Sequence, residues 1–248
     1  MRPHRLLRLA VAGAAALLAL SACGSSRIVH DQQAFTFHGT RLTIDDPQSD
    51  LRLVPGSGSG IEVQRWLSGT AAQPGHASWT LRGQTLRLDI SCSGLVFSCG
   101  SRFQVAVPAD LPVTVHSSAG DDTVSGLAGS VVIDDDSGQV RVSGTSGPLK
   151  ISTGSGNITA SGLRSPTVRA TSGQGDADIG FAAAPRAAEV RCGTGNATAR
   201  VPAAGHRYRV LVTTGTGTAR SAVPDDRQSA STVRVSSANG NATVLSAA

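Results

Sequence analysis

A short glycine-centred unit recurs seven times in the second half of this chain, and it constrains the fold more than any other feature. Apolar residues stand seven and five positions before each glycine, and six units carry another one four positions after it. Apolar residues two positions apart indicate β-strands, so each unit predicts strand, tight turn and strand. The glycines are Gly120, Gly138, Gly156, Gly175, Gly195, Gly217 and Gly240. Such repetition predicts stacked units.

The residues around each turn favour one stacking geometry over another. Most of the glycines are followed by Asp or Asn, which tolerate tight-turn backbone conformations. The position three before each glycine is Ser, Thr, Asp or Cys throughout, as expected if equivalent side chains form a ladder at about 4.8 Å spacing. These features predict an all-β, β-helix-like solenoid of parallel strands. An antiparallel meander or sandwich remains the alternative, because Gly-Asx pairs also close hairpins.

Composition and spacing define the extent of the repeats. Aromatic residues make up only 3% of the chain, which suits a thin interior filled by Val, Ile, Leu and Ala. Regular repeats of about 18–23 residues are predicted over 113–248. Residues 35–112 are predicted to form irregular β coils and a cap that continue the same domain. An early copy of the unit is centred on Ser49, with Leu42, Ile44, Leu51 and Leu53 at its apolar positions.

The N-terminus has the pattern of a bacterial export signal. Arg2, Arg5 and Arg8 precede a short apolar run, Leu9 to Leu20. The run ends in Leu-Ser-Ala-Cys, which resembles a lipobox, with cleavage between Ala22 and Cys23 and acylation of the Cys23 thiol. We therefore predict a lipoprotein signal peptide over 1–22, a flexible tether over 23–34, and a lipid-anchored protein on the extracytoplasmic face of the cell membrane. An ordinary secretory signal is the alternative.

The remaining cysteines give one prediction of a covalent link. Cys92 and Cys99 flank a six-residue loop, and in an exported protein this spacing predicts a disulfide. A metal site is the alternative, although no His partner lies nearby. Cys192 occupies the small polar position of its repeat, so it is interpreted as a filler of the stack, with a reactive thiol as the other possibility.

Charge and motif content exclude several classes of function. Loss of residues 1–22 removes three arginines and no acid, so the formal net charge falls from +5 to +2, too little for a nucleic-acid-binding protein. No nucleophile–base–acid set, cofactor motif or histidine metal site is found, so the prediction is a protein that is not an enzyme. The acidic turn Asp134–Asp136, with Asp121 and Asp122 one unit earlier, is compatible with calcium or with a solvated turn.

Taken together, the lipobox, the run Phe103–Pro108, Val113-Thr-Val115 and the repeated turn units resemble the bacterial putative-adhesin family of unknown function. The resemblance implies a right-handed β-solenoid outside the cytoplasmic membrane. The predicted function is a non-enzymatic surface lipoprotein that binds a cell-wall polymer or an envelope protein. The alternatives are an accessory of an envelope-stress sensing system and a polysaccharide-active enzyme that uses the acidic turn. The last unit, 233–248, is predicted to lie at a free end of the stack. Short strands and solvated turns suffice to protect such an end, and pairing with a second molecule or another envelope protein is the other hypothesis.

Overall fold

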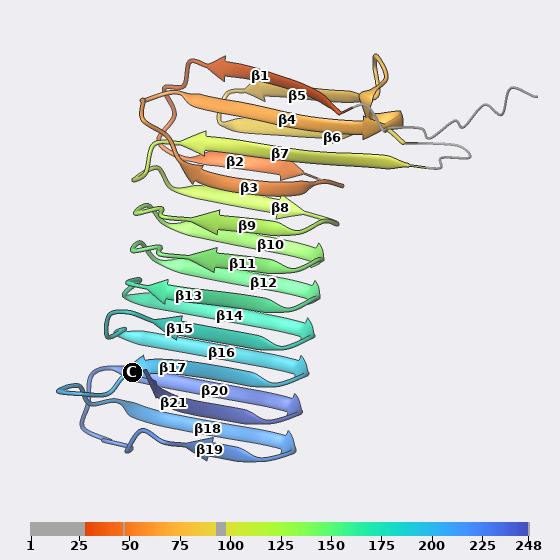
Figure 1. Cartoon of the computed structure of the whole chain (residues 1–248). Coiled ribbons are helices and arrows are strands. Elements are labelled where there is room, and N and C mark those ends of the chain that lie inside the picture. The colour runs from red at the N-terminus through yellow and green to blue at the C-terminus, as the bar shows by residue number, and fades with distance from the viewer. Residues whose placement is uncertain (1–27, 47, 93–97, 248) are drawn as a thin grey trace, which may run out of the picture.

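The computed structural model describes residues 28–46, 48–92 and 98–247, which form two long β-sheets (Figure 1). In spatial order the eleven-stranded sheet contains β1 (Val29–Phe35), β4 (Ile61–Gly69), β7 (Cys99–Val107), β3 (Asp50–Pro55), β9 (Asp122–Ser125), β11 (Val140–Ser143), β13 (Ile158–Leu163), β15 (Ala177–Phe181), β17 (Ala197–Pro202), β21 (Ala242–Ala247) and β19 (Ala219–Ser221).

The ten-stranded sheet lies behind it and contains β18 (Arg209–Thr216), β20 (Thr232–Asn239), β16 (Ala187–Thr194), β14 (Thr167–Gln174), β12 (Leu149–Ser155), β10 (Val131–Ser137), β8 (Val113–Ser117), β2 (Leu42–Asp46), β6 (Thr85–Ile90) and β5 (Ala77–Arg82). One 3-10 turn, η1 (Thr70–Ala72), is the single helical element of the described ranges. None of their helices is long and apolar enough to cross a membrane.

The repeats are superposed in parallel. From β8 onward the chain alternates between the two sheets, and each strand pairs in parallel with its equivalent in a neighbouring unit. The pairing register agrees with the spacing of the glycines, because the residues seven before successive glycines pair with one another. These residues form one row: Val113, Val131, Leu149, Val168 and Ala188. The antiparallel alternative is therefore wrong for these units.

The interior is a narrow apolar column between the sheets. Alternate residues of each strand point inward, so Val131, Ile133 and Val140 are almost fully buried while their neighbours are more exposed. Burying each such side chain stabilises the fold by about 1.5–3 kcal/mol. Because both sheets contribute one small aliphatic row after another, the column needs few aromatic side chains.

The early copy of the unit is confirmed. Leu42 and Ile44 of β2 pair with Val113 and Val115 of β8, and Leu53 of β3 pairs with Val124 of β9. The segment predicted to form irregular β coils and a cap, 35–112, also contains β4, β5, β6 and β7. Strands β4 and β5 pair antiparallel with their neighbours, so the regular parallel pattern stops at this end of the stack.

Bulkier side chains fill this irregular end. The guanidinium of Arg65 lies 4.1 Å from the centroid of the Trp79 ring, and Trp79 meets Phe103 edge-on with ring centroids 6.4 Å apart. The predicted disulfide joins Cys92 to Cys99, with their Cα atoms 6.4 Å apart. The disulfide therefore links the segment after β6 to the start of β7, next to the antiparallel strands.

The predicted flexible tether is wrong over residues 29–34. These residues belong to β1, which pairs antiparallel with β4 along its whole length. The Asp31 carboxylate accepts hydrogen bonds from Arg65 at 2.9 and 3.0 Å, and the His30 ring stacks on Trp66. These polar residues show no alternation of apolar and polar positions. Backbone pairing and cross-strand contacts hold β1 in place, and burial of apolar side chains contributes little.

The last two units do not follow chain order. Strands β20 and β21 are inserted between β16–β17 and β18–β19, so the chain turn formed by β18 and β19 lies at the free end. The C-terminus accordingly lies beside an interior layer of the stack (Figure 1). Buried Tyr208 anchors the long connections, because its hydroxyl donates to the Pro202 carbonyl at 2.7 Å and its own carbonyl accepts from the Asp226 N–H at 2.9 Å.

This order corrects the predicted position of the final unit. Residues 233–248 were expected at a free edge, but removal of this segment would take away an interior layer. The longer spacings before Gly217 and Gly240 now have a physical reason. After β17 the chain passes the layer of β20 and β21 to form β18 and β19, and it then returns to form β20 and β21. The longer connections that this path needs cost little conformational entropy.

Candidate functional site

A continuous row of polar and aromatic side chains runs along the outer face of the eleven-stranded sheet, beside the tight turns. We call it the turn row. The strand register and the ladder bonds described below place its members in the order His30, Trp66, Arg102, Asp50, Asp121, Gln139, Asn157, Asp176, Asn196, Asn241 and Thr218. The row therefore spans the whole stack.

Most of the turn row is a ladder of Asp and Asn side chains. The side-chain oxygen of each accepts the backbone N–H that follows the turn in the next layer, as for Asn157 with Asp176 at 2.8 Å and Asp176 with Asn196 at 2.7 Å. The ladder continues from Asn196 to Asn241 at 3.0 Å and from Asn241 to Thr218 at 2.9 Å. It satisfies backbone donors that the turn leaves unpaired. The sequence predicted the turn role of these residues but not the bond between layers.

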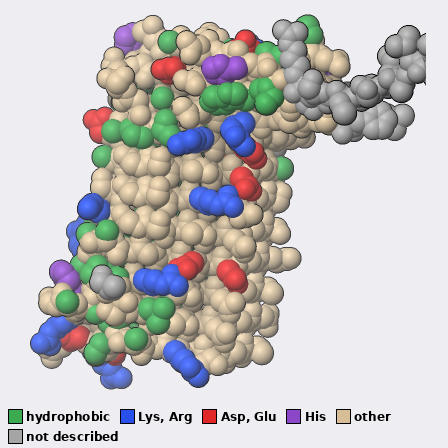
Figure 2. Space-filling view, in the orientation of Figure 1, with side chains coloured by type: hydrophobic (Ala, Val, Ile, Leu, Met, Phe, Trp, Pro, Cys, Tyr) green, Lys and Arg blue, Asp and Glu red, His purple; other side chains and the backbone are tan. Residues whose placement is uncertain are grey.

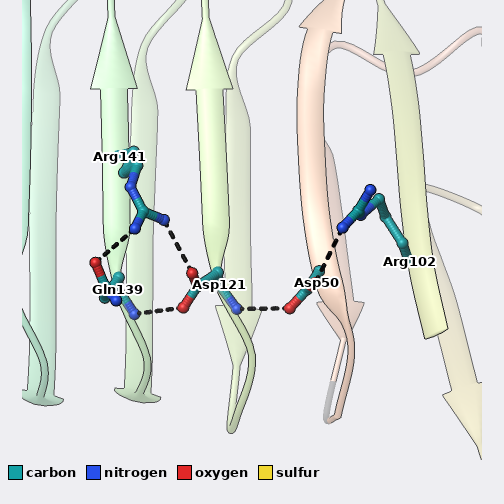
Figure 3. Close-up of polar contacts among 5 residues, drawn as sticks. All are labelled: Asp50, Arg102, Asp121, Gln139 and Arg141. Carbon is teal, nitrogen blue, oxygen red and sulfur yellow. Dashed lines mark hydrogen bonds and ion pairs between the residues drawn. The ribbon is translucent and has the colours of Figure 1, made fainter. Parts of the chain in front are cut away.

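Charged side chains near the irregular end of this face are linked to one another by polar contacts (Figure 3). Arg141 donates to Asp121 at 2.9 Å and to the Gln139 side chain at 2.6 Å, and Arg102 lies 3.7 Å from Asp50. The hydrogen bond from Arg141 is the main reason that the pKa of Asp121 is lowered. A shallow groove of about 290 Å³ lies among these residues. All of the groups are exposed or half-buried, so they remain free to exchange partners with a ligand.

An aromatic pair adjoins these charges. The Trp66 and His30 rings stack with centroids 4.9 Å apart, and Trp66 lines a second groove of about 380 Å³ together with Arg102 and Gln48. Figure 2 shows acidic and basic side chains at two places along this face, separated by a band without charge. The place nearer the irregular end combines the faces of aromatic rings with guanidinium donors and carboxylate acceptors within a few strands.

The other predicted site residues lie elsewhere. Ala22 and Cys23 fall outside the described residues. Cys192 is buried in the interior column, and burial raises the pKa of its thiol to about 11, which keeps it protonated. Its sulfur donates a weak hydrogen bond to the Asn196 carbonyl at 3.4 Å. Its position fits the interpretation as a filler of the stack.

The acidic turn Asp134–Asp136 does not gather its carboxylates on one side. Asp134 points outward and lies 3.4 Å from the Lys150 ammonium, and Asp136 is exposed. Asp135 points inward, where the Thr153 hydroxyl donates to it at 3.0 Å. Strand alternation separates consecutive residues in this way. The carboxylates of the acidic turn are therefore divided between the surface and the interior.

The inward position three before each glycine forms the predicted column of small polar residues. At several layers its hydroxyl donates to a turn-glycine carbonyl: Ser172 to Gly156 at 2.9 Å, and Ser237 to Gly195 at 2.7 Å. The column begins with Asp46, Ser117 and Asp135, in which two carboxylates replace hydroxyls. Asp46 was missed as a member, although it stands three before Ser49 in the early copy.

Asp122 lies across the interior from this part of the column. It takes the inward place that Val140 occupies in the next layer, with the register unchanged, and only 1% of it is exposed. Burial raises the pKa of Asp122 to about 8, and the charges of Asp135 and Asp46 add to the shift. Burial likewise raises the pKa of Asp46 to about 7, and it raises the pKa of Asp135. The sequence placed Asp122 and Asp135 in one acidic group, but Asp46 was missed.

Comparison with known proteins gives a similar fold and no close relative. No family model matches the chain, and no curated protein matches its sequence. A putative adhesin from Parabacteroides distasonis has a TM-score of 0.52 at 13% identity, over 90% of this chain and 98% of that one. A putative adhesin from Bacteroides fragilis has a TM-score of 0.47 at 14% identity, over 90% and 98% of the two chains. The match to the Parabacteroides distasonis structure confirms the resemblance to the putative-adhesin family at the level of the fold.

Proposed function

We propose that this chain is a non-enzymatic, lipid-anchored envelope protein whose right-handed β-solenoid body binds a cell-wall polymer through the outer face of the eleven-stranded sheet. The observation that carries the proposal is the turn row at its irregular end, where the Trp66–His30 stack adjoins Arg102 and the Asp50 carboxylate. Parallel superposition of the units and the fold of the Parabacteroides distasonis putative adhesin support it.

Sugar polymers suit this surface because their rings offer both apolar faces and hydroxyl groups. An indole ring can cover a sugar face, while guanidinium and carboxylate groups bond the hydroxyls. The shallow shape of the two grooves also fits a chain lying across the sheet better than a small molecule in a closed pocket. The face therefore supplies recognition without catalytic groups.

The anchor would place this binding region close to the membrane. Five residues lie between Cys23 and Val29, where β1 begins, so the two residues are at most about 20 Å apart when the chain is extended. Because β1 is at one end of the eleven-stranded sheet, the β18–β19 end would lie farthest from the lipid. A wall polymer lying just above the membrane would then be within reach of Trp66.

Loss of the proposed binding groups should weaken attachment to cell wall. We expect the double variant Trp66→Ala/Arg102→Ala to co-sediment with isolated peptidoglycan at least tenfold more weakly than the unaltered chain, which corresponds to about 1.4 kcal/mol. Arg234→Ala is the matched control, because Arg234 is exposed on the other sheet. Equal binding by all three proteins, with unchanged melting temperatures, would refute the proposed face.

The anchor is tested separately. We expect Cys23→Ser to move the protein from the membrane fraction to the soluble exported fraction, because the substitution removes the proposed acyl attachment site. Immunoblotting of fractionated cells measures the change, and Cys192→Ser serves as the control for loss of a thiol. Retention of the Cys23→Ser protein in membranes would contradict lipid anchoring.

A second candidate is the accessory role in envelope-stress sensing, with the β18–β19 end as the contact surface. Leu211 of β18 is 51% exposed. Val210 and Val212 are only partly buried, whereas Val233 and Val235, the residues that pair with them in β20, are buried. Such an edge can accept a strand from a partner. Loss of stress signalling on Leu211→Glu, with cell-wall binding unchanged, would favour this role. The polysaccharide-active alternative has no such support, since the acidic turn splits its carboxylates.

A further inference from the structure

Five buried side-chain oxygens lack a hydrogen-bond partner in the part of the chain that the structure describes, and all five belong to one cluster. They are Oδ2 of Asp46, Oγ of Ser117, both carboxylate oxygens of Asp122 and Oδ1 of Asp135. Asp46 and Asp135 flank Ser117 in the inward column, and Asp122 faces inward from the opposite sheet in the same layer as Ser117. We call these four residues the carboxylate cluster.

The remaining carboxylate oxygens of the column are held in place by neighbouring hydroxyls. The Ser49 hydroxyl donates to Oδ1 of Asp46, and the Thr153 hydroxyl donates to Oδ2 of Asp135. Each aspartate is thus fixed through one oxygen while the other stays unpaired. Outer hydrogen bonds of this kind orient the ligands of metal ions in proteins.

Burial of these oxygens without a counter-charge is costly. A buried acceptor without a donor costs about 1–3 kcal/mol, and an ionised carboxylate costs more. Among the residues that the structure describes, no Lys or Arg side chain bonds any member of the cluster, and the outside charges that act on Asp122 and Asp135 are those of other acids, Asp121 and Asp136. The stabilising charge must therefore come from protons or from a bound cation.

An acidic groove leads to the cluster from outside. It has a volume of about 660 Å³ and is lined by Asp45, Asp134 and Asp136 together with the cluster members Asp46, Ser117 and Asp135. His116 and Arg87 also line it, but the Arg87 guanidinium is engaged by Asp89 at 2.9 Å. Its carboxylates would concentrate cations beside the three cluster members that line it, and Asp122 lies across the interior from these three.

We propose that the carboxylate cluster is a binding site for a hydrated calcium ion, independent of the cell-wall-binding face. All of its donors are hard oxygens, which Ca²⁺ prefers to softer ligands. No three His, Cys, Asp or Glu side chains of the described ranges are close enough to hold one metal ion directly. We infer that water completes the shell, with Asp122 and either Asp46 or Asp135 as the charged ligands and the Ser117 hydroxyl as a neutral one.

Thermal unfolding of the purified full chain at pH 8.5 tests the site. We expect 5 mM CaCl₂ to raise the melting temperature by about 5 °C or more over 1 mM EDTA, because binding to the folded state alone stabilises it. Asp122→Asn should remove this shift. Asp136→Asn, which changes an exposed carboxylate of the same groove, should keep it.

Three other results would overturn the proposal. A melting temperature unaffected by Ca²⁺ would mean that protons alone neutralise the cluster. A shift retained in Asp122→Asn but lost in Asp136→Asn would place the ion on the surface. A shift of equal size with NaCl at the same ionic strength would show general screening.

If Asp122→Asn fails to fold, isothermal titration of Ca²⁺ into Ser117→Ala should show weaker binding than for the unaltered chain. None of these results depends on cell-wall binding.

Discussion

Replacement of Gly175 by alanine is expected to destabilise the stack by more than about 4 kcal/mol and to lower the melting temperature by about 10 °C or more. Gly175 has a φ of +135°, which side-chain-bearing residues rarely adopt. A Cβ atom there would overlap the carbonyl oxygen of Gly156 in the layer below and would lie 2.9 Å from Oδ1 of Asn157. That Asn157 oxygen already accepts the Asp176 N–H, so the ladder bond would also be disturbed.

A second glycine separates the two causes of this effect. Gly205 has a φ of +73°, but a Cβ added there would meet no atom within 4 Å. Gly205→Ala should therefore cost only the conformational penalty, about 1 kcal/mol. Differential scanning calorimetry of the two variants makes the comparison. Similar losses in both would mean that backbone conformation, and not the close approach of successive layers, dictates glycine at the turns.

The second large effect concerns pH. In EDTA, the free energy of unfolding should fall by roughly 4 kcal/mol between pH 5 and pH 8, because Asp122 keeps its proton to about pH 8 when folded and to about pH 4 when unfolded. Between these values the folded protein binds a proton that the unfolded chain lacks. Raising the pH therefore favours unfolding, with the full stability present below about pH 4. Asp46 acts in the same direction up to about pH 7.

Urea denaturation at a series of pH values measures this dependence. Asp122→Asn should make the curve less steep, leaving the part that Asp46 contributes, and should make the protein more stable than the unaltered chain at pH 8, since the amide cannot ionise. Asp136→Asn should leave the slope unchanged, because that carboxylate is exposed. A stability that rises or stays constant from pH 5 to pH 8 in the unaltered chain would contradict the burial of protonated Asp122 and Asp46.

Much of the fold was predictable because the repeat carries its own register. The rows seven and five before each glycine pair across layers as the spacing requires, and even the displaced copy at Leu42 and Ile44 joins them in register. Strand β1 was not predictable, since its polar residues are held by backbone bonds and by Arg65. The turn row was visible only as separate turn residues, because Trp66 and Arg102 come from strands outside the repeat.

The amino-acid sequence by itself determined the unit: its strand alternation, its turn glycine and the inward place of each small polar residue. These properties depend on neighbours within about twenty residues. Only the tertiary structure decided the order of the layers, with β20 inserted between β16 and β18, and the meeting of Asp46, Asp122 and Asp135. The physical reason is that equivalent units present equivalent edges, so local pattern cannot choose between partners. Long connections and contacts such as Tyr208 with Pro202 make that choice.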